Sequence, residues 1–523
     1  MKQYDFIVIG AGSAGCVLAN RLSALPELEV LLLESGGPDT AEVIHTPWLW
    51  NTIPGSSLDW MYETTPQTHC NNRRIPVPRG KMFGGSSSMN AMIYQRGNPA
   101  DYDGWAELGN EGWAWEDVLP YFKKSQHQER GASDYHGVDG PLNVSDLLEP
   151  NPIAAACVAA AVEAGYPANP DFNDGDQEGF GFYQVTQKNG RRHSAAVAYL
   201  HPALKRDNLT AIPFAQVLKI DFEGKRCCGL TYDHEGTTKT VRVNREVILC
   251  AGTINSPQLL MLSGIGAEES LRQLGIPVIQ NLPGVGQNLQ DHILVPHVFR
   301  SLLPLSWPNI ISDQERSSYD ENRTGVLTSN RGEAGGFVKL TPDSPLPEVQ
   351  FHFLPTMPIL APEFEGHHGF ILSPGLVHVT SVGELTLQSA DPYDPPLINP
   401  NFLSTEIDRQ NMVKALKISR EITSQKALDS IRGEEILPGA TVQTDVELLE
   451  YIREMVATIY HPAGTCKMGL DDMAVVNDRL QVHGVEGLRV ADISIMPTLI
   501  NANTNAPAMM IGEKCAEMII ATL

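Results

Sequence analysis

The stretch "YDFIVIGAGSAGCVLANRL" at residues 4–22 constrains the fold of this chain more than any other. It begins with a short apolar run, residues 6–9, which is typical of a parallel strand buried on both faces. Gly10, Gly12 and Gly15 then form G-x-G-x-x-G, in which the first glycine permits a tight turn, the second lets the backbone approach a pyrophosphate and the third lets the next helix pack closely. Because the free N–H groups at the start of that helix favour phosphate, the stretch predicts a dinucleotide-binding βαβ unit.

A carboxylate at the expected distance strengthens this prediction. The run "EVLLLES" predicts a second strand that ends in Glu34, about 20 residues after the loop, where a ribose-binding carboxylate belongs. The alternative is a structural turn with Glu34 merely at a strand end. The pattern alone does not separate NAD from FAD.

The length of 523 residues favours two domains rather than one core. Residues 35–78 form an irregular excursion, and such long loops often serve function. Residues 209–224 and 240–252 are strand-like and extend the nucleotide sheet, whereas 348–355, 370–380 and 383–389 predict an antiparallel sheet in a second domain. Helical patterns cover 114–125, 151–165, 406–426 and 444–457, and a helix within 252–266 is predicted to start at Ser256-Pro257. The run "LRVADISIMP" predicts one more buried strand, ending near Asp492.

The composition excludes several classes of function. A formal net charge of −24 disfavours nucleic acid and anionic lipid as partners. The eight cysteines contain no C-x-x-C pair, so we expect no metal site and no disulfide framework, but reduced thiols in the cytoplasm. The chain runs directly into the glycine loop, from which we expect no signal peptide. Its longest apolar run, residues 153–162, is about half of a membrane span, which leaves peripheral contact with the inner membrane open.

Several blocks in a fixed order resemble the glucose–methanol–choline (GMC) flavoprotein oxidoreductases. They are the glycine loop, "GKMFGGSSSMNAMIY", "GTINSPQLLMLSGIG", "GVGQNLQDH", "YHPAGTCKMG" and "ADISIMPTLINANTNAPAMMIGEK". The match covers nearly the whole chain, and "GFYQVTQKNGRRHSAAVAYL" and "FHFLPT" are most similar to the bacterial alcohol and choline dehydrogenase branch.

The resemblance implies an α/β plus α+β fold, in which a Rossmann-like FAD-binding domain is interleaved with a substrate domain built on an antiparallel sheet with helices. We expect the FAD-binding domain to comprise residues 1–150, 190–300 and 455–523, and the substrate domain to comprise 151–189 and 301–454.

The resemblance also implies FAD as the cofactor. The residues expected to bind FAD are Gly10, Gly12, Gly15, Glu34, Gly84, Gly85, Asn90, Ala91, Met92, Val217, Asp492, Asn505, Ala506 and Pro507. Some members of the family tether the flavin through a histidine in the block that reads "GGSSSMN" here, and Met89 occupies that position. Because a thioether is not expected to form that bond, we predict non-covalent FAD.

The resemblance places the catalytic base at His461 and a second catalytic residue at Asn503. Pro462 pushes His461 out of the helical region, and a neutral imidazole is suited to accept a hydroxyl proton. The amide of Asn503 is expected to donate to the developing alkoxide. Asn501 and Asn505 are alternatives for that role, and all three could instead satisfy turn backbone.

The implied reaction is oxidation of a primary aliphatic or aryl alcohol to the aldehyde, with a hydride passing to flavin N5 and a quinone, another carrier or O₂ as the electron acceptor. Trp48, Leu49 and Trp50 could line an apolar pocket or belong to the core. Choline would need a carboxylate or an aromatic cage, and the sequence identifies neither. An oxygen-using alcohol oxidase, a choline dehydrogenase and a non-redox FAD lyase on the same fold are the alternatives.

Overall fold

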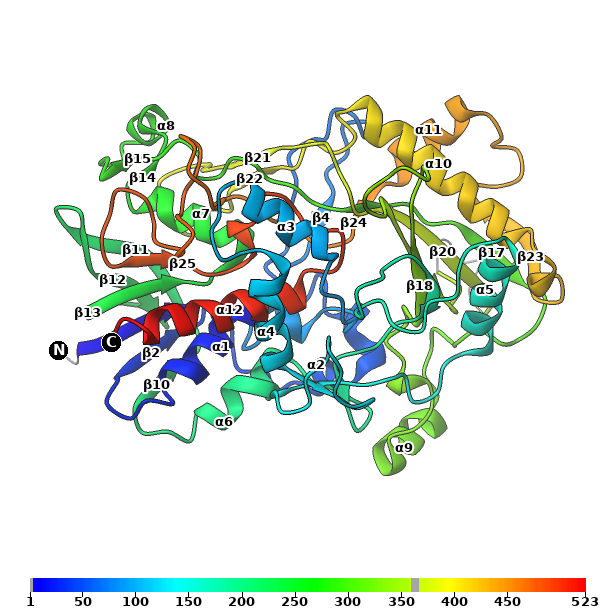
Figure 1. The fold of residues 1–523 in the computed structure, drawn as a ribbon, viewed down its shortest axis with the longest axis horizontal. Helices are drawn as coiled ribbons and strands as arrows, with labels where there is room; N and C mark the ends of the chain where they lie inside the picture. The colour runs from blue at the N-terminus through cyan, green and yellow to red at the C-terminus, as the bar shows by residue number, and fades with distance from the viewer. Residues whose placement is uncertain (1–2, 359–365) are drawn as a thin grey trace.

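A computed structural model describes residues 3–358 and 366–523 of the chain. Its first sheet is parallel at the centre, where β1 lies between β2 and β13 (Figure 1). The parallel strands are β10 (Leu209–Ile212), β2 (Val30–Leu33), β1 (Gln3–Ile9), β13 (Thr237–Leu249) and β25 (Leu488–Val490). All four residues of β2 are buried, as a strand covered on both faces requires.

The long strand β13 joins this parallel sheet to an antiparallel extension. Its first half pairs with β12 (Arg226–His234), which in turn pairs with β11 (Ala215–Glu223). Its second half pairs with β1 and β25. The two predicted strand regions therefore do extend the nucleotide sheet, although β11 and β12 run antiparallel within it.

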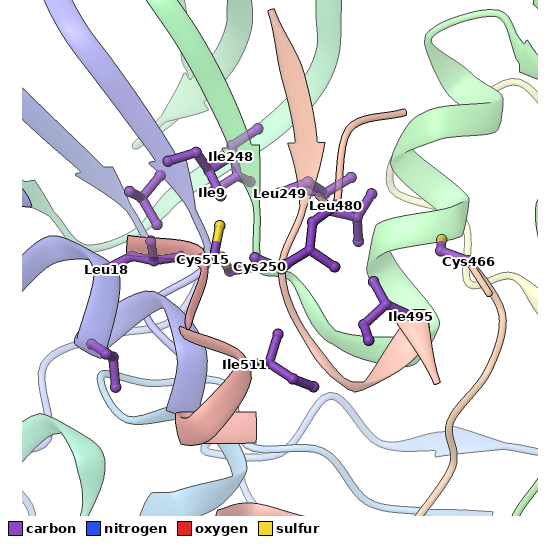
Figure 2. Packing of buried hydrophobic residues seen from close by; sticks show 14 of the residues in the cluster. Ile9, Leu18, Ile248, Leu249, Cys250, Cys466, Leu480, Ile495, Ile511 and Cys515 are labelled. Carbon is purple, nitrogen blue, oxygen red and sulfur yellow. The ribbon is translucent and has the colours of Figure 1, made fainter. Parts of the chain in front are cut away.

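Helices α1 (Ser13–Leu22) and α12 (Asn505–Ile520) pack side by side, so the two ends of the chain meet (Figure 1). A Cβ on Gly512 of α12 would lie 2.9 Å from the carbonyl oxygen of Ala14, which shows how closely the helices approach. Figure 2 shows Leu18, Ile511 and Cys515 of this pair near Ile9 and Cys250 at the strand ends. This packing brings the C-terminal block to the glycine loop.

The second sheet is antiparallel and has the order β23-β17-β20-β19-β18-β7, with β16 pairing β20 and β24 pairing β16. Its strands are β7 (Gly179–Phe182), β16 (Ile293–Leu294), β17 (Val298–Ser301), β18 (Ala334–Val338), β19 (Val349–Leu354), β20 (Gly369–Leu376), β23 (Arg432–Leu437) and β24 (Ala457–Thr458). Helices α5 (Pro152–Glu163) and α10 (Glu406–Thr423) contact it, and α11 (Asp445–Met455) packs on α10 (Figure 1). The predicted fold class is confirmed. The domain boundaries stay predictions, and β16, β24 and most of β17 pair in this sheet although they lie in segments assigned to the FAD-binding domain.

Further short elements lie outside these two sheets. They are α2 (Glu42–His45), η1 (Pro47–Thr52), β3 (Tyr62–Glu63), β4 (Pro76–Val77), η2 (Gly85–Ser88), α3 (Pro99–Glu107), α4 (Trp115–Ser125), β5 (Gln126–Gln128), β6 (Leu142–Val144), β8 (Gln187–Lys188), β9 (Arg191–Arg192), η3 (Ala196–Leu200), α6 (His201–Ala203), β14 (Ile265–Gly266), α8 (Glu268–Gln273), β15 (Gln280–Asn281), α9 (Asp313–Asn322), η4 (Val326–Thr328), β21 (Glu384–Thr386), β22 (Leu397–Asn399), η6 (Lys426–Leu428) and η7 (Ile493–Ile495). Within the described residues, no helix combines the length and the apolar character that crossing a membrane requires.

Two sequence predictions are wrong in detail. The helix predicted to start at Ser256-Pro257 is α7 (Gly252–Leu262), which begins earlier and contains Pro257. Pro257 has no N–H for the carbonyl of Thr253, and the hydroxyl of Thr465 donates to that carbonyl instead at 2.6 Å. The strand predicted at 383–389 pairs with β22 in a separate ribbon, not with the second sheet.

Candidate active site

A cavity of about 460 Å³ is lined by residues of both sheets. Ile9 and Leu33 contribute from the parallel sheet, and His352, Leu354 and Ser373 contribute from the antiparallel sheet. The glycine loop, the start of α7 and the segment around His461 also line the cavity. A cavity shared by a nucleotide-binding sheet and a second sheet can hold a cofactor and a substrate side by side.

The three glycines of the loop have different steric surroundings. Gly10 has φ +96°, and a Cβ there would lie 2.6 Å from the carbonyl oxygen of Cys250. A Cβ on Gly15 would lie 1.9 Å from the carbonyl oxygen of Gly10, so Gly15 serves helix packing and does not line the cavity. Gly12 lines the cavity, and its Cβ would meet only the Cys250 oxygen, at 3.8 Å. The open space beside Gly12 is therefore a cradle that any side chain would fill.

Glu34 lies at the end of β2 and lines the same cavity. Its two carboxylate oxygens accept the backbone N–H groups of Ala11 and Gly36, each at 2.8 Å. Burial raises the pKa of Glu34 to about 7 despite these hydrogen bonds. The carboxylate keeps further lone pairs for ribose hydroxyls, whose donation would favour its ionised form.

The loop after Gly84 packs directly on the glycine loop. A Cβ on Gly85, where φ is +50°, would lie 2.9 Å from the Cα of Gly12. Gly84 donates its N–H to the carbonyl of Ala11 at 2.7 Å and does not line the cavity. The other predicted residues of this loop line it, namely Gly85, Asn90, Ala91 and Met92. Met89 lines the cavity as well.

The C-terminal block also contributes to the wall of the cavity. The carboxylate of Asp492 accepts hydrogen bonds from the N–H of Gly252 at 2.9 Å and the hydroxyl of Ser256 at 2.6 Å, which fixes the start of α7. Asn505 accepts from the hydroxyl of Ser13 at 2.7 Å. Val217, Asp492 and Asn505 line the cavity, whereas Ala506 and Pro507 are buried in the first turn of α12 and do not.

Sequence analysis missed the N-terminus of α7 as part of the site. Ala251, Gly252, Thr253, Ile254 and Asn255 all line the cavity. Gly252 has φ +80°, and a Cβ on it would have no neighbour within 4 Å. The site thus presents two helix N-termini, those of α1 and α7, together with Gly12 and Glu34. This donor set and the open glycine fit a dinucleotide.

His461 is buried on the wall of the cavity, and its two ring nitrogens have different partners. Nε2 lies 3.1 Å from Nδ2 of Asn503, and Nδ1 lies 3.0 Å from Nδ1 of His292. Asp291 accepts the backbone N–H of His461 at 2.9 Å and the hydroxyl of Thr458 at 2.6 Å. The pKa of His461 is lowered well below its usual value, first by burial and then by the neighbouring groups His292, His352 and Arg79, whose protonated forms disfavour a second positive charge.

Of the three candidate asparagines, Asn503 is the one in contact with His461. Asn501 instead donates its side chain to the carbonyl of Pro347 at 3.0 Å, and it does not line the cavity. The sequence did not identify His292 and His352 as site residues, although they lie in "GVGQNLQDH" and "FHFLPT". Burial lowers the pKa of His292 to about 3 and that of His352 to about 4, so both are neutral near pH 7.

Comparison with known proteins identifies the family of the chain. Family models of GMC oxidoreductases match residues 4–294 and 379–512. An alcohol dehydrogenase [acceptor] of Pseudomonas putida is 44% identical over 541 residues, covering 99% of this chain and 96% of that protein. An oxygen-dependent choline dehydrogenase of Cronobacter sakazakii is 45% identical, covering 99% and 95%.

Solved structures agree with the fold. Pyridoxine 4-oxidase from Mesorbium loti is 31% identical with a TM-score of 0.90, and the match covers 99% of each chain. A formate oxidase variant of Aspergillus oryzae, studied for its effect on FAD modification, is 28% identical with a TM-score of 0.94, covering 100% of this chain and 98% of that one.

Proposed function

Since the chain belongs to the GMC oxidoreductase family and is an FAD-dependent enzyme that acts on CH–OH donors, we propose that it oxidises uncharged primary alcohols, aliphatic or aryl, to aldehydes with His461 as the base. The observation that carries the proposal is the pair formed by Nε2 of His461 and Nδ2 of Asn503, 3.1 Å apart on the cavity wall. An alcohol oxygen beside both atoms can donate its proton to His461 and accept a hydrogen bond from Asn503.

The cofactor would be held by other residues on the wall of the same cavity. They are Gly12, Glu34 and the N-termini of α1 and α7. When bound, FAD supplies the acceptor for the hydride that leaves the carbinol carbon. The protein holds the hydroxyl proton at Nε2 of His461, keeps negative charge on the oxygen near Asn503, and excludes bulk water by burial.

The charges that line the cavity favour a neutral substrate over choline. Among the described residues, the carboxylates on its wall are Glu34, which is hydrogen-bonded to the glycine loop, and Asp492, which is hydrogen-bonded to the start of α7, while Arg79 lies on the wall as a cation. Glu333, next to the lining residue Gly332, is buried and accepts hydrogen bonds at 2.6 Å from Trp307, Ser329 and the N–H of Asn151. Its oxygens are thus engaged elsewhere. Trp50, Trp60 and Leu354 give the wall apolar surface.

Anaerobic flavin reduction tests the proposal. Holoenzyme is mixed with 1-octanol, benzyl alcohol, D-glucose or choline, and bleaching of the flavin is followed. We expect 1-octanol or benzyl alcohol to bleach it fastest. Fastest bleaching by choline would overturn the substrate class. Absence of bleaching by every alcohol would favour the non-redox lyase instead.

We also propose that a quinone or another carrier, rather than O₂, reoxidises the flavin. The P. putida relative is named as a dehydrogenase with an unspecified acceptor. Peroxide should then form far more slowly than aldehyde in air, and mole-for-mole formation would contradict the proposal. A cytoplasmic enzyme with peripheral contact at the inner membrane would meet such a quinone. Co-sedimentation with lipid vesicles tests that contact.

FAD should leave the protein when it unfolds. Met89, which lines the cavity, stands where some family members attach flavin through histidine, and its thioether is not expected to form that bond. Precipitation with acid should therefore give a colourless pellet and a yellow supernatant. A yellow pellet, with flavin still attached after proteolysis, would show that the prediction is wrong.

The pH profile of flavin reduction should be flat from about pH 6.5 to 9. Burial lowers the pKa of His461 below the usual value of about 6.5, so the neutral base persists across that range and is lost only when protons add at lower pH. Stopped-flow reduction at saturating alcohol measures the profile. An inflection near pH 7 would instead point to Asp291, whose pKa burial raises to about 7, and Asp291→Asn should then remove it.

A further inference from the structure

The side chain of Asn503 has a second partner that its proposed catalytic role does not use. Gln350 lies in β19 and is completely buried. Its Nε2 is 3.0 Å from Oδ1 of Asn503 and 3.4 Å from the hydroxyl oxygen of Tyr183. That hydroxyl lies 2.6 Å from the backbone carbonyl oxygen of Phe351. Tyr183, Gln350 and Asn503 therefore form a buried chain that leads to His461.

The donors and acceptors of this chain allow one orientation. A backbone carbonyl oxygen only accepts, so the hydroxyl of Tyr183 donates to Phe351. The oxygen of Tyr183 is then an acceptor, and the group of Gln350 that faces it is the NH₂. The same NH₂ donates to Asn503, which turns the Oδ1 of Asn503 toward Gln350 and its NH₂ toward His461.

We propose that Gln350, held by Tyr183, is a positioning residue that orients the Asn503 carboxamide and thereby keeps the lone pair of His461 on Nε2. An NH₂ group facing Nε2 requires an unprotonated nitrogen there, so the neutral ring carries its proton on Nδ1. Nδ1 then donates to Nδ1 of His292. The inference rests on the proposed function, because it presumes that His461 is the base.

If the carboxamide of Asn503 were rotated by a half turn, His461 could not act as the base. The carbonyl oxygen of the carboxamide would then face Nε2 of His461 and favour the tautomer protonated at that atom. Such a ring has no lone pair on Nε2, the nitrogen beside Asn503, and could not accept the alcohol proton there. Gln350→Met keeps a long side chain but removes the donor that prevents the rotation.

A double-mutant cycle tests the proposal with holoenzyme and 1-octanol or benzyl alcohol, whichever reduces the wild-type flavin faster. Gln350→Met should slow flavin reduction about 10-fold in the wild type, and less than about 2-fold when Asn503→Ala is already present. Equal slowing in both backgrounds, or no slowing in either, would overturn the positioning role. Tyr183→Phe should show the same pattern, with a smaller slowing of flavin reduction in the wild-type background. It serves as a second variant if Gln350→Met does not fold.

A spectroscopic readout separates positioning from general damage. With histidine labelled by ¹⁵N, the ring signals of His461, assigned by their loss in His461→Ala, should show the Nδ1–H tautomer in the wild type and a share of Nε2–H in Gln350→Met. Wild-type-like tautomers in the variant would count against the proposal. Gln95→Met is the matched control, since Gln95 is equally buried and its amide has no hydrogen-bond partner among the described residues. If His461→Ala itself reduces flavin rapidly, the proposed function fails rather than the positioning step alone.

Discussion

Replacement of His461 by alanine is expected to slow anaerobic flavin reduction by about 10²- to 10⁴-fold while FAD stays bound. An alcohol has a pKa of about 15.7, close to that of water, so ionising it at pH 7 without a base costs about 12 kcal/mol. The Nε2 atom of His461 lies on the cavity wall and accepts this proton in our proposal. Stopped-flow reduction at saturating alcohol isolates the step from reoxidation.

The control for this experiment is His234→Ala, because His234 lies in β12 and does not line the cavity. That variant should reduce its flavin at the wild-type rate. The flavin absorption spectrum shows whether FAD is bound in both variants. A His461→Ala enzyme that bleaches within a few-fold of the wild-type rate would contradict the base assignment, even though the fold and the family would stand.

The nucleotide end of the site could be predicted from the sequence because local sterics dictate it. A Cβ on Gly15 would overlap the carbonyl oxygen of Gly10, five residues earlier, so the spacing of these two glycines reflects the geometry of the loop. Glu34 follows its strand directly and therefore lies at the strand end. These constraints act over a few residues, and a single sequence displays them.

The surroundings of His461 could not be predicted in the same way. His292 and Asn503 contact His461, and Gln350 contacts Asn503, from segments that are far apart in the chain. Gln350 lies in β19 and His292 directly precedes β16 of the second sheet, whereas Asn503 precedes α12, so only the tertiary fold brings them together. The prediction of where α7 starts is wrong for a related reason. A proline is common in the first turn of a helix, which placed the start at Ser256-Pro257. Here Thr465, a residue from a distant segment, donates to the carbonyl that Pro257 leaves unpaired, so the helix can begin earlier.

Gly12→Ala is expected to weaken FAD binding about 10- to 100-fold without unfolding the protein. The backbone at Gly12 has φ −76° and ψ −164°, which alanine adopts without strain. Its Cβ would meet no protein atom closer than 3.8 Å and would fill the cradle beside the start of α1. Overpacking of a fitted site by one methyl costs about 1–3 kcal/mol, and each 1.4 kcal/mol is tenfold in affinity. Titration of apoprotein with FAD measures the change.

Two glycine variants decide whether the lost affinity comes from the cradle. Gly104→Ala in α3 adds a methyl where no atom lies within 4 Å, so its FAD affinity should match the wild type. Gly15→Ala forces a Cβ to 1.9 Å from the carbonyl oxygen of Gly10 and should lower the melting temperature of the apoprotein as well as FAD binding. Gly12→Ala should resemble Gly104→Ala in melting temperature but Gly15→Ala in affinity. If Gly12→Ala instead bound FAD as tightly as the wild type, the pyrophosphate would not lie against this glycine, and the placement of the cofactor would have to be revised.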